Sequence, residues 1–301
     1  MAEIHSVSFA VGQIMGFGGM PAISALVFSP IDLDPSEIQS VVFCVHGGSY
    51  DKRYFHIEVP GSDDYSLCGY FADRGVIAIT IDCLDTGESA RAEEPESVTV
   101  RNLTEANHLA AVQLAERLKS GTLVPGLPPL PRIVITGIGH SLGGLLVTVQ
   151  QSVHSSFDRV AVLGWSNLGL ALDSNALRPI FDPTGKYVYG TPELRHSFHM
   201  PDVPEAVLVC PAECEISPIS VALAAESADL ESTRRAAATI TVPVFVGVGE
   251  KDTSPSPQAE TACFGSATDI TFFQLNGSAH CHNFSNTRTI LWDRLLTWMA
   301  A

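Results

Sequence analysis

A serine framed by glycines is the residue of this sequence best placed to do chemistry. The segment GHSLG at residues 139–143 follows the apolar run Ile133–Ile135 and leads into the helix-period stretch Leu142–His154. Glycines two residues before and after a serine let neighbouring chain pass a tight strand-to-helix turn without clashing. The helix that begins after Ser141 would aim its N-terminal N–H groups at an oxyanion forming beside that serine. This pattern predicts that Ser141 is a nucleophile that attacks an acyl carbon.

A nucleophilic serine needs a base, and the base needs an acid to orient it. The candidate acids are Glu250 and Asp252, which follow an apolar run in the sequence GEKD, and the candidate bases are His280 and His282. In an extended loop, side chains two positions apart are expected to point in opposite directions, so that only one of these histidines could face Ser141. The residue types alone leave both choices open.

Eight apolar runs of strand length supply the elements that must position these residues. From Val41 onward the runs alternate with helix-period segments such as Thr104–Leu118. Runs rich in Val and Ile, apolar on both faces and separated by helices, predict an α/β fold with a mainly parallel eight-stranded sheet covered by helices on both faces. The first two runs have no helix between them, which predicts an antiparallel hairpin. The runs are Ser6–Ala10, Ile23–Phe28, Val41–Val45, Val76–Ile81, Ile133–Ile135, Val160–Leu163, Val242–Val248 and Ile270–Leu275.

An amphipathic helix is expected to follow the histidines. Apolar side chains recur there at spacings of three and four, and Asn283 or Ser285 could cap its start. The recurring residues are Phe284, Thr287, Leu291, Leu295 and Trp298.

The alternation of strands and helices breaks between Ser166 and about Arg235. This segment is richer in Pro, His and acidic residues, and no strand–helix unit fits it. We interpret it as a cap inserted at the end of a strand, where α/β proteins place their binding crevices. A long irregular surface loop is the alternative, although about seventy structureless residues would be unusual. The predicted domains are a core of residues 1–165 and 236–301 and a cap of residues 166–235.

Together these segments resemble the α/β-hydrolase superfamily over most of the chain. VVFCVHGGSY at residues 41–50 resembles the third strand of that family and its oxyanion loop, and GHSLGG resembles its nucleophile turn. Residues 69–89 resemble the next helix end, strand and D-x-x-G-x-G-x-S turn, in which Asp85 replaces one glycine. Asp82, Asp85 and Glu88 are interpreted as building this turn. The resemblance implies the α/β-hydrolase fold with an inserted cap.

The resemblance also implies roles for single residues. The family carries its acid at the last position of GEKD, here Asp252, with Glu250 as the alternative. Its base lies in the loop after the last strand, here His280 in GSAH where G-x-G-H is usual. The order of nucleophile, acid and base is that of the family. His282 is then expected to pack or to face solvent at the start of the last helix.

The oxyanion loop follows from the same resemblance. Backbone N–H groups of Gly48 and Leu142 would form the oxyanion hole, while His46 would contact substrate and shape the loop rather than transfer protons. Trp165, Ser166 and Asn167 are expected to line the substrate pocket, together with apolar side chains between residues 168 and 200.

The expected reaction is hydrolysis of a carboxylic ester or lactone of a small, mostly apolar molecule through an acyl-enzyme, and a thioester also fits. Two alternatives stay open: hydrolysis of a carbon–carbon bond in a diketone, and a catalytically silent receptor on the same fold. A serine at this turn argues against epoxide hydrolysis and dehalogenation, which need a carboxylate nucleophile. The chemistry requires no cofactor, and the spacings His280-Cys281-His282 and His196…His199 do not match a known zinc motif.

Composition limits the partners and the compartment. The formal net charge of −16 makes nucleic acid and membrane surfaces poor partners. The expected partner is a small-molecule substrate, and the sequence is compatible with a homodimer. Seven cysteines in an odd number, without a CxxC pair, indicate reduced thiols and a cytoplasmic protein. The first residues lack the pattern of a secretion signal, and no apolar run is long enough to predict a membrane span.

Overall fold

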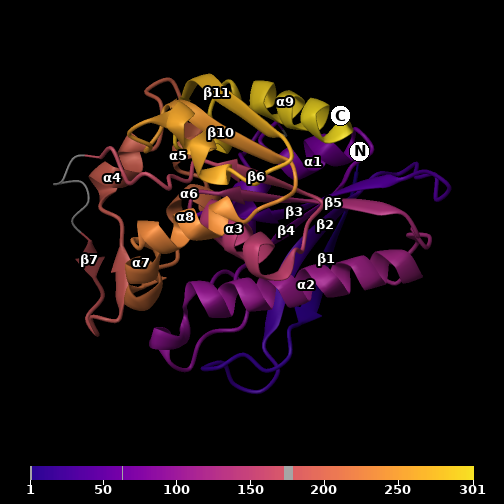
Figure 1. Cartoon of the computed structure of the whole chain (residues 1–301), viewed down its shortest axis with the longest axis horizontal. Coiled ribbons are helices and arrows are strands. Elements are labelled where there is room, and N and C mark those ends of the chain that lie inside the picture. Colours follow the sequence, from indigo (N-terminus) through magenta and orange to yellow (C-terminus); the bar gives the residue numbers. More distant parts are fainter. Residues whose placement is uncertain (1, 63, 173–178) are drawn as a thin grey trace.

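An eight-stranded sheet forms the centre of the protein (Figure 1). The computed structural model describes residues 2–62, 64–172 and 179–301. The strands lie in the order β1-β2-β4-β3-β5-β6-β10-β11, and each of the eight expected runs forms one of them. Their bounds are β1 Glu3–Ala10, β2 Ala22–Ser29, β3 Gln39–Val45, β4 Ile77–Ile81, β5 Ile133–His140, β6 Arg159–Leu163, β10 Val244–Lys251 and β11 Ile270–Ala279.

The sheet is parallel except at one side. β1 and β2 form an antiparallel hairpin and β2 runs antiparallel to β4, whereas all neighbours from β4 to β11 are parallel. The mainly parallel sheet and the antiparallel hairpin predicted from the sequence are therefore confirmed. β5 continues past Ile135 to His140. The sequence did not predict this extension, because it contains Gly137 and Gly139 and glycine is poorly suited to strand interiors.

Helices cover both faces of the sheet, because both faces are apolar. Along β3, odd-numbered residues point into one core and even-numbered residues into the other. The first core lies under α2 (Val100–Ser120) and α3 (Leu142–His154), and the second under α1 (Leu67–Ala72) and α9 (Arg288–Ala300) (Figure 1). Among the described residues, no helix combines the length and the apolar character needed to cross a membrane. Short 3-10 turns are η1 Lys52–Phe55, η2 Pro95–Ser97, η3 Pro257–Phe264 and η4 His282–Phe284.

The last helix begins later than the sequence predicts. α9 starts at Arg288 and its N-cap, Thr287, makes no side-chain capping bond. The two residues expected to cap this helix make other hydrogen bonds. Asn283 accepts a hydrogen bond from Trp292 Nε1 at 2.9 Å, and Ser285 Oγ donates to Gly277 O at 3.0 Å. The capping prediction was wrong because both side chains close the loop between β11 and α9.

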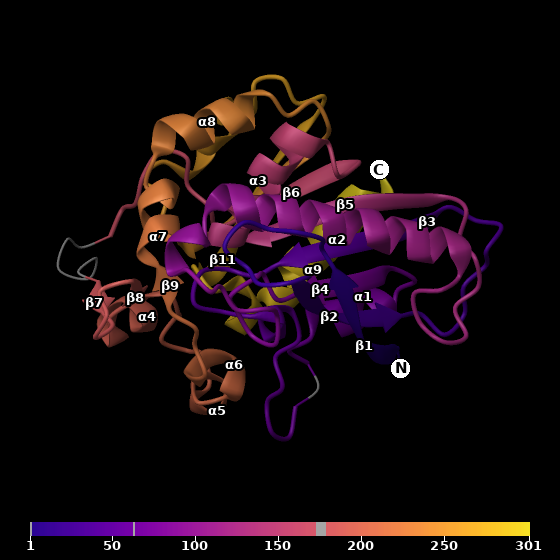
Figure 2. The same ribbon diagram turned by 90° about the horizontal axis from the view of Figure 1, so that it is seen from below.

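The described part of residues 166–235, which we call the cap, forms a separate small sheet and a series of short helices at one end of the molecule (Figures 1 and 2). Its last two helices pack back onto the core: α7 contacts α2, and α8 contacts α3. Part of the range expected to line the pocket, residues 173–178, lies outside the described residues. The elements are β7 Ile180–Phe181, β8 Tyr187–Tyr189, β9 Ile219–Ser220, α4 Pro192–Ser197, α5 Glu205–Leu208, α6 Pro211–Cys214, α7 Val221–Ser227 and α8 Leu230–Ala238.

Candidate active site

Ser141 occupies the junction between β5 and α3. β5 ends at His140 and α3 begins at Leu142, so Ser141 alone makes the turn. Its φ of 52° and ψ of −121° lie outside the regions that residues other than glycine favour. The N–H group donates to Leu163 O at 2.7 Å, whereas the side chain makes no capping bond to α3. The turn therefore holds the hydroxyl at a helix N-terminus without using it as a cap.

The flanking glycines are required because other segments pass close to them. A Cβ atom at Gly139 would collide with Gly143 O, and a Cβ atom at Gly143 would collide with Val45 O. Larger residues would push the start of α3 away from the ends of β3 and β5. The glycine spacing seen in the sequence is thus a packing requirement of this turn.

Asp252 follows β10 and meets His280, which follows β11. Asp252 Oδ1 lies 2.7 Å from His280 Nδ1, and both side chains are buried. The N–H groups of Gly249 and Thr253 each donate to the carboxylate at 2.8 Å. Burial would raise the pKa of Asp252, but electrostatic attraction to His280 and His282 and their hydrogen bonds hold this pKa well below its usual range. The carboxylate therefore stays ionised and orients His280.

The nucleophile turn and the histidine loop lie against each other. The ring centroids of His280 and His140, the residue before Ser141, are 4.8 Å apart. Because Nδ1 of His280 is bound to Asp252, Nε2 is the ring atom left to take a proton. Between the described side chains of Ser141 and His280 no hydrogen bond forms in this structure. Catalytic hydrogen bonds are often long without substrate and tighten in the substrate complex.

His282 does not pack passively or face solvent, which corrects the expectation from the sequence. Its Nε2 lies 2.8 Å from Asp252 Oδ2, and its side chain is 1% exposed. The prediction assumed an extended loop, in which His280 and His282 would diverge. Instead Cys281 has φ −83° and ψ 78°, and His282 N donates to His280 O at 3.0 Å. This inverse γ-turn reverses the chain and brings both rings to one carboxylate.

His140 holds the histidine loop from the other side. Its Nε2 donates to His280 O at 2.9 Å, and its ring stacks on Tyr54 with centroids 4.2 Å apart. Burial, with His280 and His282 nearby, holds the pKa of His140 well below its usual range. The ring is therefore neutral and acts as a hydrogen-bond donor. Sequence reasoning gave His140 no role, because the residue before the serine is not fixed by the strand-to-helix turn.

The loop of residues 46–49 after β3, which is expected to supply the oxyanion hole and which we call the oxyanion loop, approaches the start of α3. A Cβ atom at Gly48 would lie 3.6 Å from Leu142 Cδ2, and no described residue accepts a hydrogen bond from the N–H of Gly48 or Leu142. His46 is buried, with Nδ1 2.8 Å from Gly47 O and Nε2 3.0 Å from Thr86 Oγ1. Its ring therefore braces the loop against the turn after β4.

Two residues expected to line the pocket, Ser166 and Asn167, instead bind one buried carboxylate. Ser166 Oγ donates to Glu260 Oε1 at 2.6 Å, and Asn167 N donates to Glu260 Oε2 at 2.9 Å. Trp165 Nε1 donates to Asn167 Oδ1 at 3.3 Å. Ser166 and Asn167 are only 2% and 1% exposed, so Glu260, rather than a ligand, satisfies their polar groups. Glu260 carried no sequence signal, because a lone glutamate in a polar stretch is usually solvated.

Glu250, the alternative acid, points elsewhere. Its Oε2 accepts a hydrogen bond from Gly277 N at 2.8 Å, and the residue is exposed. Its carboxylate braces the turn within β11, whereas the carboxylate of Asp252 holds both histidines. Within the described ranges, no group of three or more His, Cys, Asp or Glu side chains is arranged to hold a metal ion.

The sequence matches one family model, "Alpha/beta hydrolase family", over residues 41–290. The chain belongs to the α/β-hydrolase family. No curated protein sequence matches this hydrolase, but many solved structures share its fold.

Three of these structures illustrate the range of the fold. A monoacylglycerol lipase from Paleococcus ferrophilus is 16% identical, with a TM-score of 0.62 and coverage of 99% of this chain and 98% of that chain. A 2-hydroxy-6-oxo-6-phenylhexa-2,4-dienoate hydrolase from a Rhodococcus species is 16% identical, with a TM-score of 0.62 and coverage of 99% of both chains. A thermophilic esterase from Thermogutta terrifontis is 13% identical, with a TM-score of 0.64 and coverage of 98% of both chains. At these identities the likeness concerns the fold alone.

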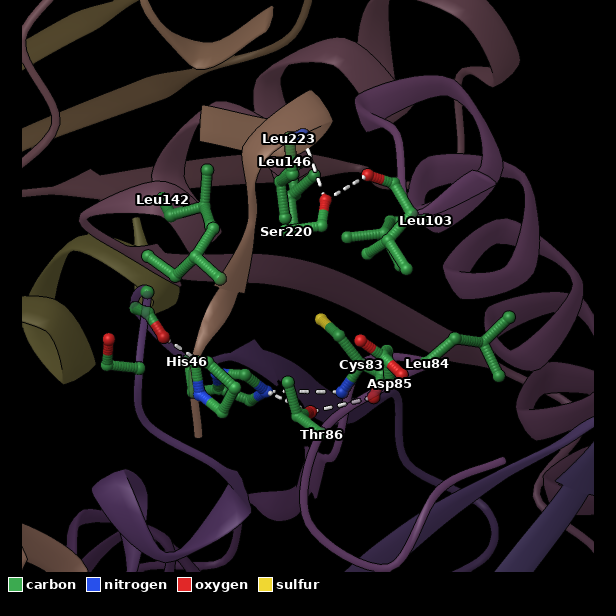
Figure 3. A pocket seen from close by; sticks show the side chains of 16 residues that line it. His46, Cys83, Leu84, Asp85, Thr86, Leu103, Leu142, Leu146, Ser220 and Leu223 are labelled. Atoms are coloured by element: carbon green, nitrogen blue, oxygen red, sulfur yellow. Dashed lines mark hydrogen bonds between the residues drawn. The ribbon is translucent and has the colours of Figure 1, made fainter. Parts of the chain in front are cut away.

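A small cavity of the hydrolase adjoins the oxyanion loop (Figure 3). Its volume is about 30 Å³, and apolar side chains from the core and the cap enclose most of it. Ser220 closes one side, where its Oγ donates to Val98 O at 2.9 Å. The apolar residues that line it are Leu84, Val98, Leu103, Leu142, Leu146, Pro218, Ile219 and Leu223.

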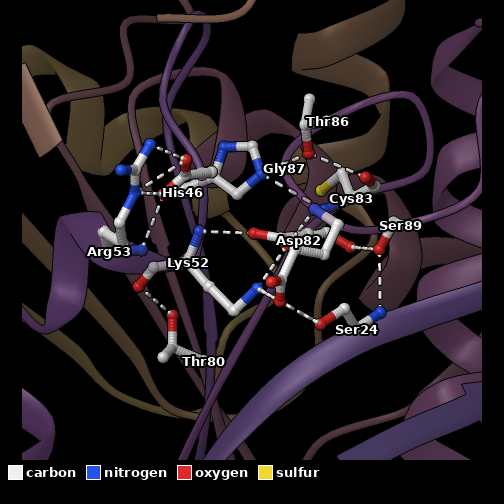
Figure 4. Close-up of polar contacts among 12 residues, drawn as sticks. Ser24, His46, Lys52, Arg53, Thr80, Asp82, Cys83, Thr86, Gly87 and Ser89 are labelled. Atoms are coloured by element: carbon white, nitrogen blue, oxygen red, sulfur yellow. Dashed lines mark hydrogen bonds and ion pairs between the residues drawn. The ribbon is translucent and has the colours of Figure 1, made fainter. Parts of the chain in front are cut away.

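Behind the oxyanion loop, the hydrolase buries an ion pair (Figure 4). Asp82 accepts hydrogen bonds from Lys52 Nζ at 2.7 Å, Lys52 N at 2.8 Å and Glu88 N at 2.8 Å. Burial would lower the pKa of Lys52, but hydrogen bonds with Asp82 and Glu88 raise it. Asp82 and Glu88 thus build the turn after β4, as expected, and also fix the chain that follows the oxyanion loop. Lys52 gave no sequence signal, because an isolated lysine usually lies at the surface.

The cap of the hydrolase is joined to the same loop by buried polar contacts. Tyr50 OH donates to Glu213 Oε2 at 2.7 Å, and Arg195 pairs with Glu213 at 2.5 Å. Burial would raise the pKa of Glu213, but His199, Arg195 and Tyr50 lower it. Tyr50 also contacts Cys281 Sγ at 3.2 Å. One tyrosine therefore connects the oxyanion loop, the cap and the histidine loop.

Proposed function

We propose that this hydrolase cleaves a carboxylic ester or lactone of a small, mostly apolar molecule through an acyl-enzyme on Ser141. The observation that carries the proposal is the convergence of three elements at the carboxyl edge of the parallel strands. Ser141 stands at the strained turn after β5, and the buried Asp252–His280 pair follows β10 and β11.

Each residue has a distinct part in the proposed reaction. Ser141 Oγ attacks the acyl carbon while His280 Nε2 takes its proton, and Asp252 stabilises the resulting imidazolium. The N–H groups of Gly48 and Leu142 bind the oxyanion. The protonated His280 then gives its proton to the leaving alcohol. A water molecule, activated by His280, releases the acid and restores the free serine.

The size of the proposed substrate rests on the cavity beside the oxyanion loop. A space of about 30 Å³ enclosed by leucine, isoleucine and valine side chains suits an apolar group of a few carbon atoms. The fold neighbours named as a monoacylglycerol lipase and an esterase are consistent with ester cleavage.

Carbon–carbon bond hydrolysis is the second candidate. It is favoured by one fold neighbour, the 2-hydroxy-6-oxo-6-phenylhexa-2,4-dienoate hydrolase. The same serine, histidine and aspartate serve both reactions, so only substrates can separate them. A catalytically silent receptor is the third reading.

Labelling and turnover test the proposal together. A fluorophosphonate probe should label the parent protein once by intact mass, and Ser141→Ala should abolish both labelling and turnover of p-nitrophenyl esters. Ser36→Ala, on an exposed loop, is the matched control and should keep both. Short-chain esters should be cleaved fastest.

Labelling of Ser141→Ala would exclude this nucleophile. Turnover of a dienoate diketone, with no turnover of an ester or lactone, would favour the second candidate. Labelling without any turnover would favour the receptor.

A further inference from the structure

Both oxygens of Asp252 hold a histidine. Oδ1 lies 2.7 Å from His280 Nδ1, and Oδ2 lies 2.8 Å from His282 Nε2. The N–H groups of Thr253 and Gly249 donate to Oδ1 and Oδ2 respectively. Each oxygen therefore accepts one backbone and one imidazole hydrogen bond, and the carboxylate has no freedom to rotate.

The contacts fix the proton on His282. An ionised carboxylate only accepts hydrogen bonds, so Nε2 of His282 carries the hydrogen. Its other nitrogen, Nδ1, is buried and has no hydrogen-bond partner among the described residues. His282 therefore donates to Asp252 through Nε2.

This arrangement is poorly explained by packing alone. A buried nitrogen without a partner destabilises the folded protein, and an apolar side chain of similar volume would avoid that cost. Only a hydrogen-bond donor at this position can supply the second side-chain hydrogen bond to Asp252. The inverse γ-turn at Cys281 makes it geometrically available.

We propose that His282 is a positioning residue that acts through Asp252 on His280. It holds the carboxylate so that Oδ1 stays in line with His280 Nδ1. The negative charge of Asp252 is then stabilised by hydrogen bonds from both histidines. The inference rests on the proposed function, because the reaction is what makes the orientation of His280 matter. The arrangement extends the usual three residues by a fourth, supplied two positions after the base.

Kinetics on the full-length protein test the role. His282→Leu should lower kcat by about ten- to a hundredfold, the range expected for losing a hydrogen bond to a charged group, while KM stays close to that of the parent. His282→Gln keeps an N–H donor near the position of Nε2 and should recover most of the rate. His108→Leu is the control, because His108 stacks on His154 and has no contact with Asp252. A folded His282→Leu protein with the kcat of the parent would overturn the proposal.

Two further readouts do not depend on the substrate. The rate of fluorophosphonate labelling should fall in His282→Leu as kcat does. In protein labelled with ¹⁵N-histidine, the parent should show two strongly downfield imidazole N–H signals, from His280 and His282. His282→Leu should lose one and shift the other, whereas His282→Gln, which keeps the donor, should lose one and change the other much less. An unshifted His280 signal in His282→Leu would show that the two histidines are not coupled through Asp252.

These readouts separate the possible failures. If the parent is not labelled and cleaves no ester, the proposed function fails, while the coupled N–H signals still decide the inference. If His282→Leu does not fold, His282→Asn replaces it, because its shorter amide does not reach Asp252. Equal rates for His282→Gln and His282→Asn would then overturn the positioning role.

Discussion

At the scale of single residues, the site depends on how one carboxylate is surrounded. Asp252 receives four hydrogen bonds, two from backbone N–H groups and two from histidines. These bonds explain why its pKa lies well below the usual range despite burial. The ionised carboxylate selects the tautomer of His280 with hydrogen on Nδ1, which leaves Nε2 free for the proton transfer that the proposed reaction requires.

Replacing the carboxylate tests this selection. Asp252→Asn should lower kcat by about 10⁴-fold with the fold intact, since an amide favours the wrong tautomer of His280. Steady-state hydrolysis of a p-nitrophenyl ester measures the effect. Glu250→Gln is the matched control and should change the rate little, because Glu250 binds Gly277 N instead of either histidine. The opposite ranking would move the acid to Glu250.

The sequence predicted only some of the residues that form the candidate site. The glycine pattern singled out Ser141 because steric limits at the turn leave few alternatives. The choice between His280 and His282 could not be made from spacing, because it depends on the backbone angles of Cys281. A γ-turn has no strong sequence signal, and so the role of His282 was missed.

At the scale of elements, the cap and the oxyanion loop are held together by Glu213. Tyr50, which follows the loop, donates to a carboxylate from α6, and Arg195 from α4 pairs with the same group. The contact crosses from the inserted segment to the catalytic edge of the sheet. The strength of the contacts with Glu213 should therefore affect how firmly the cap is held on the core.

The lowered pKa of Glu213 gives this contact a defined pH dependence. Its stabilisation is fully present above the unfolded pKa of about 4.3 and is lost as pH falls through the lower folded pKa. Glu213→Gln should cost about 1–3 kcal/mol of unfolding free energy near neutral pH, and the difference from the parent should shrink below about pH 4. Thermal unfolding at several pH values measures it.

An exposed cap residue supplies the control for this prediction. Glu205→Gln, at the start of α5, should leave the unfolding temperature unchanged at each pH. A Glu213→Gln difference that is the same at pH 3 and pH 7 would show that packing, rather than charge, holds the cap.

At the scale of the whole molecule, the sequence predicted the strands of the central sheet but none of the short elements within residues 166–235. Strands of the sheet are apolar on both faces and carry their own signal, and each of the eight expected runs forms a strand. The helices and strands described in the segment 166–235 are instead two to nine residues long, too short for a periodic pattern. Its contacts with the core, such as Glu213 with Tyr50, join residues far apart in the chain and leave no local trace.

The insertion of the cap divides the site residues between two stretches of chain. The oxyanion loop and Ser141 precede it, and Asp252 and His280 follow it. Its β7–β8 hairpin has an exposed turn at Thr184–Gly185, and exposed turns tolerate a break in the chain better than buried segments do. We expect two fragments divided at this turn to be inactive alone and to regain ester hydrolysis when co-expressed. Activity of the first fragment by itself would mean that Ser141 works without His280. The hydrolase would thus serve as a complementation reporter whose signal requires both fragments to meet along β6 and β10.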